Sequence, residues 1–377
     1  MNDQSLTIVN VVGARPNFMK MAPLCREFAR HPSITSYLVH TGQHYDRAMS
    51  DLFFTQLGLP EPDRHLGIGS GGHGEQTGRI MIAFEAVLRE LAPDLVVVVG
   101  DVNSTIACAL VAVKMGIAVA HVEAGLRSGD RTMPEEINRV LTDQISDLLF
   151  TTERSATENL TGEGVDESRI YFVGNVMIDS LLASKAEAAN SNVLNELSVP
   201  AKGYALVTLH RPSNVDSPES LARLVDMVLE LADDLPVVFP VHPRTQAKLE
   251  DAQLHARISA HSGVRLTGPL SYLDFLHCTE NAKVVVTDSG GIQEETTVLG
   301  VPCITCRENT ERPITVTEGT NILVGSDPRR ALEEARRVLK GDGKVGRQPE
   351  YWDGQAAKRI CNILRSDWQS GRLLRNL

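Results

Sequence analysis

The sequence has no apolar run long enough to span a bilayer, and its start lacks a basic region followed by an apolar one. We therefore expect no membrane partner and a cytoplasmic location. The chain also lacks an excess of positive charge, since 37 Lys and Arg face 48 Asp and Glu and give a net charge of -11. This balance argues against a nucleic-acid partner, so an anionic ligand needs a local basic pocket.

Cysteine pairs with metal-site spacing are also missing. Cys303 and Cys306 match C-x-x-C, but no second Cys or His pair completes four zinc ligands, and no thioredoxin-like context surrounds them. The six cysteines are predicted to be buried reduced thiols, with no metal and no cofactor.

Alternating apolar strands and helical stretches fill the chain. The predicted strands are Leu6–Val12, Ser36–His40, Leu95–Gly100, Ala118–Glu123, Leu148–Thr152 and Ile170–Val173, then Tyr204–Leu209, Val237–Val241, Val264–Leu266, Lys283–Thr287 and Cys303–Thr305. This pattern is typical of an α/β protein with two doubly wound, Rossmann-like lobes, at 1–180 and 181–354, joined near Asp179–Ser198. We expect the active site in the interdomain cleft, at the carboxyl ends of the strands.

A strand, a tight turn and a helix are predicted around residue 290. The strand at Lys283–Thr287 is followed by Ser289, Gly290 and Gly291, and the next helix carries Glu295 within its first turns. Unpaired N–H groups and the helix dipole make such a turn an anion site, and Glu295 can then reach a ribose hydroxyl. The alternative is an ordinary corner where glycine supplies a positive φ.

The chain opens with a similar unit, in which the strand Leu6–Val12 precedes Gly13 and a helix with Pro16 at its start. Arg15 and Lys20 are candidates to bind a polyphosphate, Arg15 as a planar fork and Lys20 as a point charge. Two solvated surface cations are the alternative.

Four acidic residues lie at strand ends or begin a helix in the first lobe. Asp101 follows Val97–Gly100, Glu123 ends the next strand, and Glu135 and Glu136 begin a helix. Taken singly, Asp101 is an N-cap candidate and the two glutamates are complements to the helix dipole. As a cluster they favour acid/base chemistry.

In the second lobe a strand ends in His210, which is predicted to face the same cleft, with a solvated histidine as the alternative. Beside it, Arg211 is a candidate to bind a diphosphate, and Arg312 after the Cys303 strand is another anion-binding candidate. Gly67–Gly74 has glycines spaced like a dinucleotide fingerprint, but no preceding strand is predicted. It is interpreted as a mobile loop before a helix at Gln76–Leu91.

Seven motifs occur in order over nearly the whole chain: G-A-R-P-x-x-x-K, G-D-V-N-S-T, H-V-E-A-G-L-R, M-P-E-E-I-N-R, L-H-R-P-x-N-V-D, D-S-G-G-I-Q-E-E and T-E-R-P. Together they resemble the non-hydrolysing UDP-N-acetylglucosamine 2-epimerase family. The resemblance implies a glycosyltransferase-B type fold, a C-terminal helix at about 355–377 that crosses back to the first lobe, a homodimer and a UDP-sugar substrate. It also implies reversible C2 epimerisation through elimination of UDP to 2-acetamidoglucal and re-addition.

Roles carried over by motif follow the same resemblance. Asp101, Glu123 and Glu135 would be the acid/base and charge-stabilising carboxylates, with His210 at the leaving group. The diphosphate would be held by Arg15, Lys20, Arg211, Ser289, Gly290 and Gly291, the ribose by Glu295, the sugar or phosphate by Arg312, and the uracil near Phe275. Family members with an allosteric UDP-sugar site match at Gln43, Glu136, Arg211 and His242. Their Q-H-R segment is Gln43-His44-Tyr45-Asp46 here, which loses a cation and gains an acid, so activation by substrate is an open question.

Three alternatives share these motifs or this architecture. The first is a 2-epimerase of UDP-2,3-diacetamido-glucuronic acid or a hydrolysing variant, the second is a glycosyltransferase that uses a UDP-sugar, and the third is a UDP-sugar-binding regulator without turnover. The acid cluster favours an enzyme, and C2 proton exchange separates an epimerase from a transferase.

Overall fold

The computed structural model describes residues 5–43, 54 and 56–373, and for Arg15 it describes the backbone only. The chain forms two compact units: unit 1 is Met1–Ala183 with Glu350–Leu377, and unit 2 is Ser184–Pro349. Helix α7 (Val176–Ala188) contains the point at which the chain leaves unit 1. Each unit has its own sheet, and every strand pairing in both sheets is parallel.

The sheet of unit 1 has seven strands in the order β3-β2-β1-β4-β5-β6-β7. Their bounds are β1 Leu6–Val12, β2 Ile34–His40, β3 Arg64–His65, β4 Leu95–Val99, β5 Ala118–Ala124, β6 Leu148–Thr151 and β7 Ile170–Phe172. The order reverses between β1 and β4, which makes a switch point there. Ligands of open α/β sheets bind outside the carboxyl ends of the strands at such a point.

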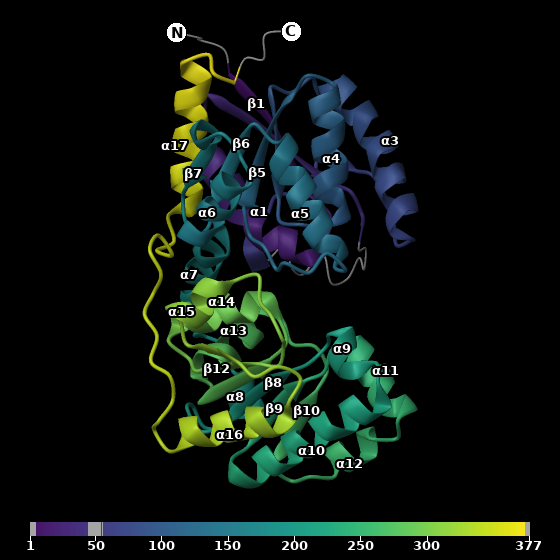
Figure 1. The fold of residues 1–377 in the computed structure, drawn as a ribbon, viewed down its shortest axis with the longest axis vertical. Coiled ribbons are helices and arrows are strands. Elements are labelled where there is room, and N and C mark those ends of the chain that lie inside the picture. The colour runs from purple at the N-terminus through teal and green to yellow at the C-terminus, as the bar shows by residue number, and fades with distance from the viewer. Residues whose placement is uncertain (1–4, 44–53, 55, 374–377) are drawn as a thin grey trace. The chain divides into compact units, whose positions relative to one another are not determined.

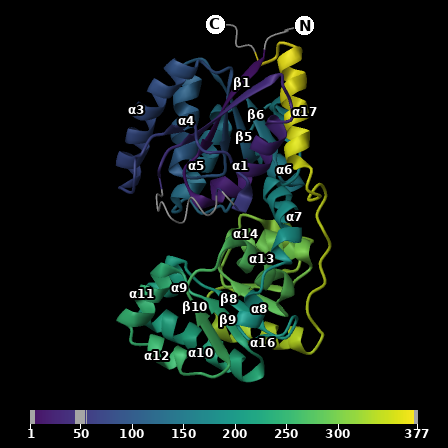
Figure 2. The same ribbon diagram turned by 180° about the vertical axis from the view of Figure 1, so that it is seen from behind.

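Helices cover the sheet of unit 1. They are α1 Arg15–Phe28, α3 His73–Leu91, α4 Asn103–Lys114, α5 Pro134–Ile145, α6 Arg154–Gly162 and α17 Ala356–Gln369, with a 3₁₀ turn at Glu167–Arg169. Figure 1 and Figure 2 show α3, α4 and α5 side by side. Their apolar residues, such as Ile80 and Phe84 of α3, pack with Val9 of β1 and Val96 of β4 in one buried cluster. The all-apolar β4 fits a strand covered on both faces.

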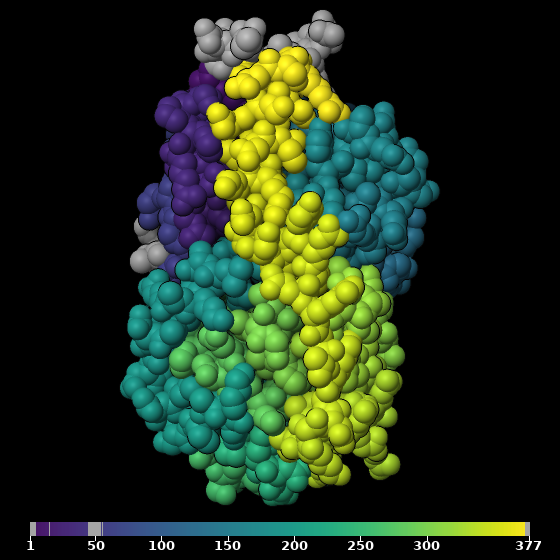
Figure 3. Space-filling view, turned by 90° about the vertical axis from the view of Figure 1, so that its left-hand side faces the viewer, coloured from purple at the N-terminus to yellow at the C-terminus, as the bar shows by residue number. Residues whose placement is uncertain are grey.

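The last helix, α17, packs against α1 in unit 1 (Figure 3). Trp352, just before it, is fully buried and donates from its indole nitrogen to the Thr152 carbonyl at 3.0 Å. Asp179 of α7 accepts from the first backbone N–H groups of α17, those of Ala356 and Ala357, at 3.1 and 2.8 Å. Gly174 has φ +91°, and a Cβ there would lie 2.0 Å from the Tyr351 carbonyl oxygen, so only glycine lets the returning chain pass.

The sheet of unit 2 has six strands in the order β10-β9-β8-β11-β12-β13. They are β8 Ala205–Thr208, β9 Val237–Pro240, β10 Val264–Thr267, β11 Val284–Thr287, β12 Cys303–Thr305 and β13 Asn321–Leu323. The helices are α8 Val193–Glu196, α9 Pro212–Val215, α10 Pro218–Asp234, α11 Pro243–Asp251, α12 His255–Ser259, α13 Tyr272–Asn281, α14 Gly290–Leu299, α15 Pro313–Thr317 and α16 Pro328–Leu339. Here the order reverses between β8 and β11, which again defines a switch point.

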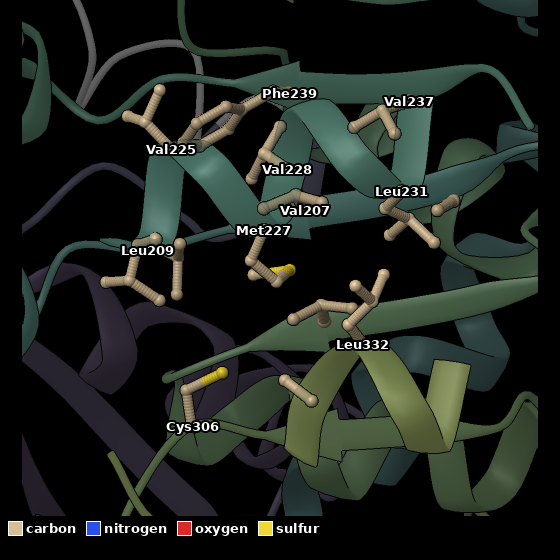
Figure 4. Packing of buried hydrophobic residues seen from close by; sticks show 14 of the residues in the cluster. Val207, Leu209, Val225, Met227, Val228, Leu231, Val237, Phe239, Cys306 and Leu332 are labelled. Carbon is tan, nitrogen blue, oxygen red and sulfur yellow. The ribbon is translucent and has the colours of Figure 1, made fainter. Parts of the chain in front are cut away.

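One face of this second sheet is covered by α10 and α16. Figure 4 shows Val228 and Leu231 of α10 and Leu332 of α16 in one cluster with Val207 of β8 and Val237 of β9. Burial of each such side chain stabilises the folded state by roughly 1.5–3 kcal/mol. This packing therefore holds the sheet, and with it the switch point, in place.

The predicted α/β architecture with two Rossmann-like sheets is confirmed, and the differences are local. β13 and β3 were not predicted, because they have only three and two residues. Since β3 ends at His65, two residues before Gly67, the prediction that no strand comes before the glycine-rich segment is wrong. Its start is tied down by hydrogen bonds from Ile68 N to Thr41 O and from Gly69 N to Gly42 O. Among the described helices, none is long and apolar enough to cross a membrane.

Candidate active site

The switch point of unit 1 is bridged by Asn17 of α1. Its side-chain oxygen accepts from the backbone N–H groups of Gly13 and Ala14, at 3.2 and 3.1 Å, and its amide nitrogen donates to Val99 O at 3.0 Å. The turn after β1 is thus linked to the end of β4. Every acid singled out in the first lobe lies on this end of the sheet or on α5, which packs against β5.

Glu123 has an unusual backbone at the end of β5. Its φ is +73°, in the left-handed region, and the pairing of β5 with β6 shifts register between Val122 and Ala124. For a residue with a Cβ this conformation costs of order 1–3 kcal/mol, and such strain clusters at functional sites. The side chain meets Lys20, with 2.6 Å between Oε1 and Nζ, and the two side chains are 2% and 5% exposed. Lys20 therefore neutralises Glu123.

Asp101 follows β4 and pairs with α5. Its Oδ2 lies 2.6 Å from Nη2 of the buried Arg139, and its backbone oxygen accepts from Asn138 Nδ2 at 2.9 Å. Helix α4 has Val102 as its N-cap residue, without a side-chain cap. The alternative of Asp101 as the N-cap is therefore wrong, and its carboxylate stays 21% exposed beside a fixed guanidinium.

The two glutamates that begin α5 differ. Glu136 is buried and accepts from Ser128 N and Oγ at 3.0 and 2.9 Å, from Gly129 N at 3.0 Å, and from Arg139. It fastens the loop that precedes the helix. Glu135 is half-buried, and its side chain makes no hydrogen bond or ion pair with any other residue that the structure describes. Of the two glutamates, Glu135 is therefore the one whose carboxylate oxygens are available to bind a ligand.

A buried network behind these acids holds two strand ends in place. His121 and Asp143 are fully buried, with 2.7 Å between His121 Nδ1 and Asp143 Oδ1. His121 Nε2 lies 2.8 Å from Gly100 O, directly before Asp101. Asp143 Oδ2 accepts from Gly125 N at 3.1 Å, two residues after Glu123, and from Arg127 Nη1 at 2.7 Å. One carboxylate of α5 thus fixes the ends of both β4 and β5.

In unit 2 the predicted strand, turn and helix are present as β11, Ser289 and α14. Neither Gly290 nor Gly291 is among the glycines with positive φ, so the alternative of a corner that needs glycine for its backbone is wrong here. A Cβ on Gly290 would lie 2.9 Å from Glu311 Oε1 and 3.0 Å from Arg312 Nη1. Glycine is needed because charged side chains approach the first helical turn. That turn presents free N–H groups, a suitable anion site.

Buried charges surround this turn. Arg312 is 2.8 Å from Glu294 Oε1 through Nε and 2.7 Å from Glu311 Oε1 through Nη1, and Arg307 contacts Glu311 Oε2 at 2.7 Å. Arg211 Nη2 approaches Glu311 Oε1 at 4.0 Å. Burial by itself would raise the pKa of Glu311, but the charges of Arg312 and Arg307 lower it below its ordinary value. The turn therefore borders a network of three arginines.

Two other predicted ligands of unit 2 lie on helices. Glu295 of α14 is 5% exposed, and its side chain makes no hydrogen bond or ion pair within the described part of the chain. Its burial raises its pKa to about 8, and the charge of Glu294 adds to this effect. A buried carboxyl group without a partner is suited to hydrogen-bond a sugar hydroxyl. Phe275 of α13 is partly buried and packs against the apolar cluster that contains Val285 and Val301.

His210 and Arg211 follow β8 and are held by Asp288, at the end of β11. Asp288 Oδ1 is 2.9 Å from His210 Nδ1, and Oδ2 accepts from Arg211 N at 2.9 Å. Arg211 Nε also donates to the Asp288 backbone oxygen at 3.2 Å. The His210 side chain is 39% exposed while Asp288 is fully buried. This places an accessible imidazole and a guanidinium at the switch point of the second sheet.

Comparison with known proteins shows which family the chain belongs to. Residues 26–365 match the UDP-N-acetylglucosamine 2-epimerase family. The chain belongs to this family. A UDP-N-acetylglucosamine 2-epimerase of Methanocaldococcus jannaschii is 44% identical over 360 residues, covering 94% of this chain and 97% of the relative. A crystal structure of M. jannaschii UDP-GlcNAc 2-epimerase in complex with UDP-GlcNAc and UDP has a TM-score of 0.88 at 42% identity, covering 96% of this chain and all of that one.

A second relative acts on a different sugar. The UDP-2,3-diacetamido-2,3-dideoxy-D-glucuronate 2-epimerase of Pseudomonas aeruginosa is 40% identical over 366 residues, covering 95% of this chain and 99% of the relative. The resemblance to the epimerase family and the glycosyltransferase-B type fold that it implies are confirmed. The named relatives differ in the sugar of their UDP-sugar.

The epimerase residues proposed for a second, allosteric ligand have partners inside their own units. Gln43 Oε1 accepts from Ser104 N and Oγ at 2.9 and 2.7 Å, at the start of α4. Glu136 fastens the loop before α5, and His242 Nδ1 accepts from Arg244 N at 3.2 Å as the N-cap of α11. His44, Tyr45 and Asp46 lie outside the described residues, as does the side chain of Arg15, a predicted diphosphate ligand.

Several residues of this candidate site were not given a role from sequence. His121, Arg127, Arg139 and Asp288 stand inside the seven motifs beside the residues chosen. Asp143 stands outside them, but its position on α5, four residues after Arg139, was a usable signal, since i and i+4 share a helix face.

The six cysteines are all buried and unpaired, as predicted. Cys361 of α17 nevertheless belongs to a group with Glu27 and His31 at the end of α1, whose ligand atoms all lie within 4.8 Å of one another. Glu27 is already paired with Arg30 and His31, at 2.8 and 3.3 Å, so this group is explained by the packing of α1 on α17.

Proposed function

We propose that this chain is an isomerase that interconverts UDP-N-acetylglucosamine and UDP-N-acetylmannosamine at C2 of the sugar. The observation that carries this proposal is the set of carboxyl groups in unit 1. Asp101, Glu123 and Glu135 come from the ends of two adjacent strands and from the start of the helix packed on them, and one buried network fixes all three elements.

The chemistry needs such a set because the C2 proton is not acidified by a neighbouring carbonyl. In the proposed reaction a base removes the C2 proton, the C–H electrons form the C1–C2 double bond, and the C1–O electrons leave with UDP. The intermediate is 2-acetamidoglucal. UDP then attacks C1 again while an acid delivers a proton to the opposite face of C2. Positioned carboxyl groups are the usual means for both proton transfers.

In unit 1 we assign proton transfer and stabilisation of positive charge at C1 to Asp101, Glu123 and Glu135. Asp101 and Glu123 each have a fixed cation beside them, Arg139 and Lys20. The sequence assigned Lys20 to the diphosphate, but its ammonium group is buried against Glu123. We therefore propose that Lys20 acts on Glu123 and holds it in place for the reaction.

In unit 2 we assign the nucleotide. The first turn of α14, with Ser289, Gly290 and Gly291, supplies backbone N–H groups for the diphosphate, and Arg211 and Arg312 supply positive charge. Arg15 is a further candidate from α1. Glu295 has the free buried carboxyl group that a ribose hydroxyl requires, and the exposed part of Phe275 lies on α13 as a neighbour for uracil. His210 assists the leaving diphosphate.

The proposal is tested by incubating the purified protein with UDP-N-acetylglucosamine in D2O and following the sugar by proton NMR. Loss of the C2 proton signal together with a new UDP-N-acetylmannosamine anomeric signal supports epimerisation by elimination. Release of free sugar and UDP would instead identify a hydrolysing enzyme. A C2 proton that stays in place with no new sugar would overturn the proposal for this substrate.

A second substrate is suggested by the 40% identical P. aeruginosa relative. UDP-2,3-diacetamido-2,3-dideoxy-glucuronic acid carries a carboxylate in place of the C6 hydroxymethyl group, and it is tested in the same NMR experiment. Exchange at C2 of this sugar with no exchange for UDP-N-acetylglucosamine would move the proposal to the uronic acid.

We propose a homodimer in the cytoplasm. Support for an assembly comes from large apolar residues exposed on two helices that both pack on α4: Ile82 of α3 is 77% exposed, and Ile137 and Leu141 of α5 are 43% and 49% exposed. Light scattering coupled to size exclusion should give a molar mass of twice the chain mass. In the double variant Ile82→Lys and Leu141→Lys the molar mass should fall to that of a single chain. The six free thiols agree with a reducing compartment.

A further inference from the structure

Asp288 lies between the last residue of β11 and the anion-binding turn, and it is fully buried. Its carboxylate accepts from His210 N at 3.1 and 3.0 Å, from Arg211 N at 2.9 Å and from Asn214 Nδ2 at 2.9 Å. It therefore fastens the turn after β8 to the turn after β11, and these two strands flank the switch point of the sheet. Three backbone and amide contacts would suffice for this structural task.

The fourth contact involves the imidazole ring, with 2.9 Å between His210 Nδ1 and Asp288 Oδ1. An ionised carboxylate only accepts hydrogen bonds, so Nδ1 must carry the hydrogen. Burial would raise the pKa of Asp288, but its hydrogen bond and charge interaction with His210 and its bonds from Asn214 and Arg211 lower it below the ordinary value. Asp288 is therefore the charged partner.

The other ring nitrogen of His210 is left for a ligand. Nε2 makes no hydrogen bond with the residues that the structure describes, and the side chain is 39% exposed. The other polar groups nearby are occupied: the His242 ring, with its centroid 5.4 Å away, uses Nδ1 to cap α11, and Arg211 lies beside Glu311 at 4.0 Å. Such an arrangement of carboxylate, histidine and open Nε2 is typical of an oriented acid/base or hydrogen-bond donor.

We propose that Asp288 is a positioning residue that acts through His210: it holds the ring with Nε2 directed at the departing diphosphate and stabilises positive charge on it. This inference rests on the proposed function. As the C1–O bond breaks, its electron pair passes to the β-phosphate oxygen of UDP. In the imidazolium form of His210 both ring nitrogens carry hydrogen, so its Nε2–H group donates to that oxygen, and the reverse occurs when UDP adds back.

A double-mutant cycle separates this role from a purely structural one. The proteins are the full chain, Asp288→Asn, His210→Gln and the double variant, each measured for kcat and KM with UDP-N-acetylglucosamine and for UDP affinity by calorimetry. Residues that act as one unit have non-additive effects. We expect each single variant to lower kcat about 10–10³-fold with KM within about threefold, and the double variant to be no slower than the slower single one.

The control variant is Asp216→Asn, which makes the same chemical change at a carboxylate that is 39% exposed and paired with Arg244 in the same unit. It should keep wild-type kcat. Effects of Asp288→Asn and His210→Gln that multiply in the double variant, or an Asp288→Asn variant with full kcat, would overturn the proposal. A fall in UDP affinity as large as the fall in kcat would do the same, because it would indicate loss of the whole turn.

A measurement on the unaltered chain covers the case in which Asp288→Asn does not fold. Nitrogen NMR of histidine-labelled protein should find the hydrogen of His210 on Nδ1, and a neutral ring with its hydrogen on Nε2 alone would overturn the proposal. This readout does not depend on turnover. If the wild type leaves UDP-N-acetylglucosamine unchanged while Nδ1 carries the hydrogen, the proposed substrate is wrong. The proposal that Asp288 orients the His210 ring is then still supported.

Discussion

Each unit pairs a histidine with a fully buried aspartate, but the two units use the pair differently. In unit 1 His121 and Asp143 are both fully buried, and the two ring nitrogens are taken by Asp143 and by the Gly100 carbonyl. In unit 2 Asp288 is fully buried while the His210 side chain is 39% exposed, with one nitrogen left over. The same residue types therefore serve as an internal brace in one unit and as a candidate for substrate contact in the other.

The two units also use their positively charged residues differently. Unit 1 surrounds acidic groups with single cations, Lys20 on Glu123 and Arg139 on Asp101, which suits residues that exchange protons. Unit 2 surrounds a helix start with arginines, which suits a diphosphate. The comparison predicts that variants of the unit 1 carboxylates lose turnover and that variants at the first turn of α14 lose nucleotide affinity.

The sharpest contrast is expected from Glu123→Gln. The amide cannot exchange a proton, so kcat should fall about 10²–10⁴-fold while UDP affinity, assigned to unit 2, stays within about twofold. Deuterium incorporation at C2 and calorimetry measure the two quantities. Glu75→Gln, at an exposed carboxylate paired with Arg79, is the control and should leave both unchanged. An equal loss of UDP affinity would break the division between the units.

Asp143→Asn tests the brace of unit 1. It removes the charge that holds the buried His121 and the partly buried Arg127, and we expect the free energy of unfolding to fall by about 3–5 kcal/mol. Glu163→Gln removes the other partner of Arg127, where the carboxylate is 32% exposed, and should cost less than about 1 kcal/mol. Urea unfolding compares the two variants. Similar losses would show that burial does not distinguish these partners.

Glu295 provides a test by pH in unit 2. Burial and the charge of Glu294 raise its pKa to about 8 in the folded chain. Because the folded pKa exceeds the unfolded one, the associated stability is fully present below about pH 4.5 and is lost as pH rises towards 8. Relative to Glu295→Gln, the wild type should lose up to about 1.4 kcal/mol per pH unit in this window. The measurement is urea unfolding of both proteins at pH 6 and pH 8. An equal change in the free energy of unfolding between these pH values for the two proteins would contradict the prediction.

The smallest expected effect comes from Gly290→Ala. The added Cβ would lie 2.9 Å from Glu311 Oε1 and 3.0 Å from Arg312 Nη1, so the arginine network must shift away from the helix start. We expect UDP affinity to fall about tenfold, or roughly 1.4 kcal/mol. Gly78→Ala is the control, because a Cβ there meets nothing within 4 Å. Unchanged UDP affinity in Gly290→Ala would remove the first turn of α14 from the proposed nucleotide site.

Much of the fold was predictable because its strands are short apolar runs. β4 is Leu-Val-Val-Val-Val and β12 is Cys-Ile-Thr, and both were predicted within a residue or two of their bounds. β3 and β13 escaped because two or three residues carry no periodicity, and strands of that length exist only through pairing with a neighbour. Helix α14 was predicted from the two glycines at its start. Glycine is needed at Gly290 because charged side chains approach it closely, and neither glycine has a positive φ.

The candidate site was predictable as a list of residues but not as a set of partners. Lys20 was assigned to phosphate from its spacing to Arg15, yet it lies on Glu123, 103 residues away in the chain. Asp101 was weighed as a helix cap and instead pairs with Arg139. Such pairings depend on which strand ends become neighbours, and no local pattern encodes the order of strands.

Apolar periodicity and motif order can be read along the linear chain, and they were enough to predict the family, the α/β class and the residues that carry charge at strand ends. The folded structure then set which of these charges meet and which of them water can reach. It placed Glu123 in a strained bulge against a buried lysine, and it left Glu135 and His210 Nε2 without partners among the described residues. Burial and long-range pairing set these outcomes, because a charge needs a partner wherever the fold removes it from water.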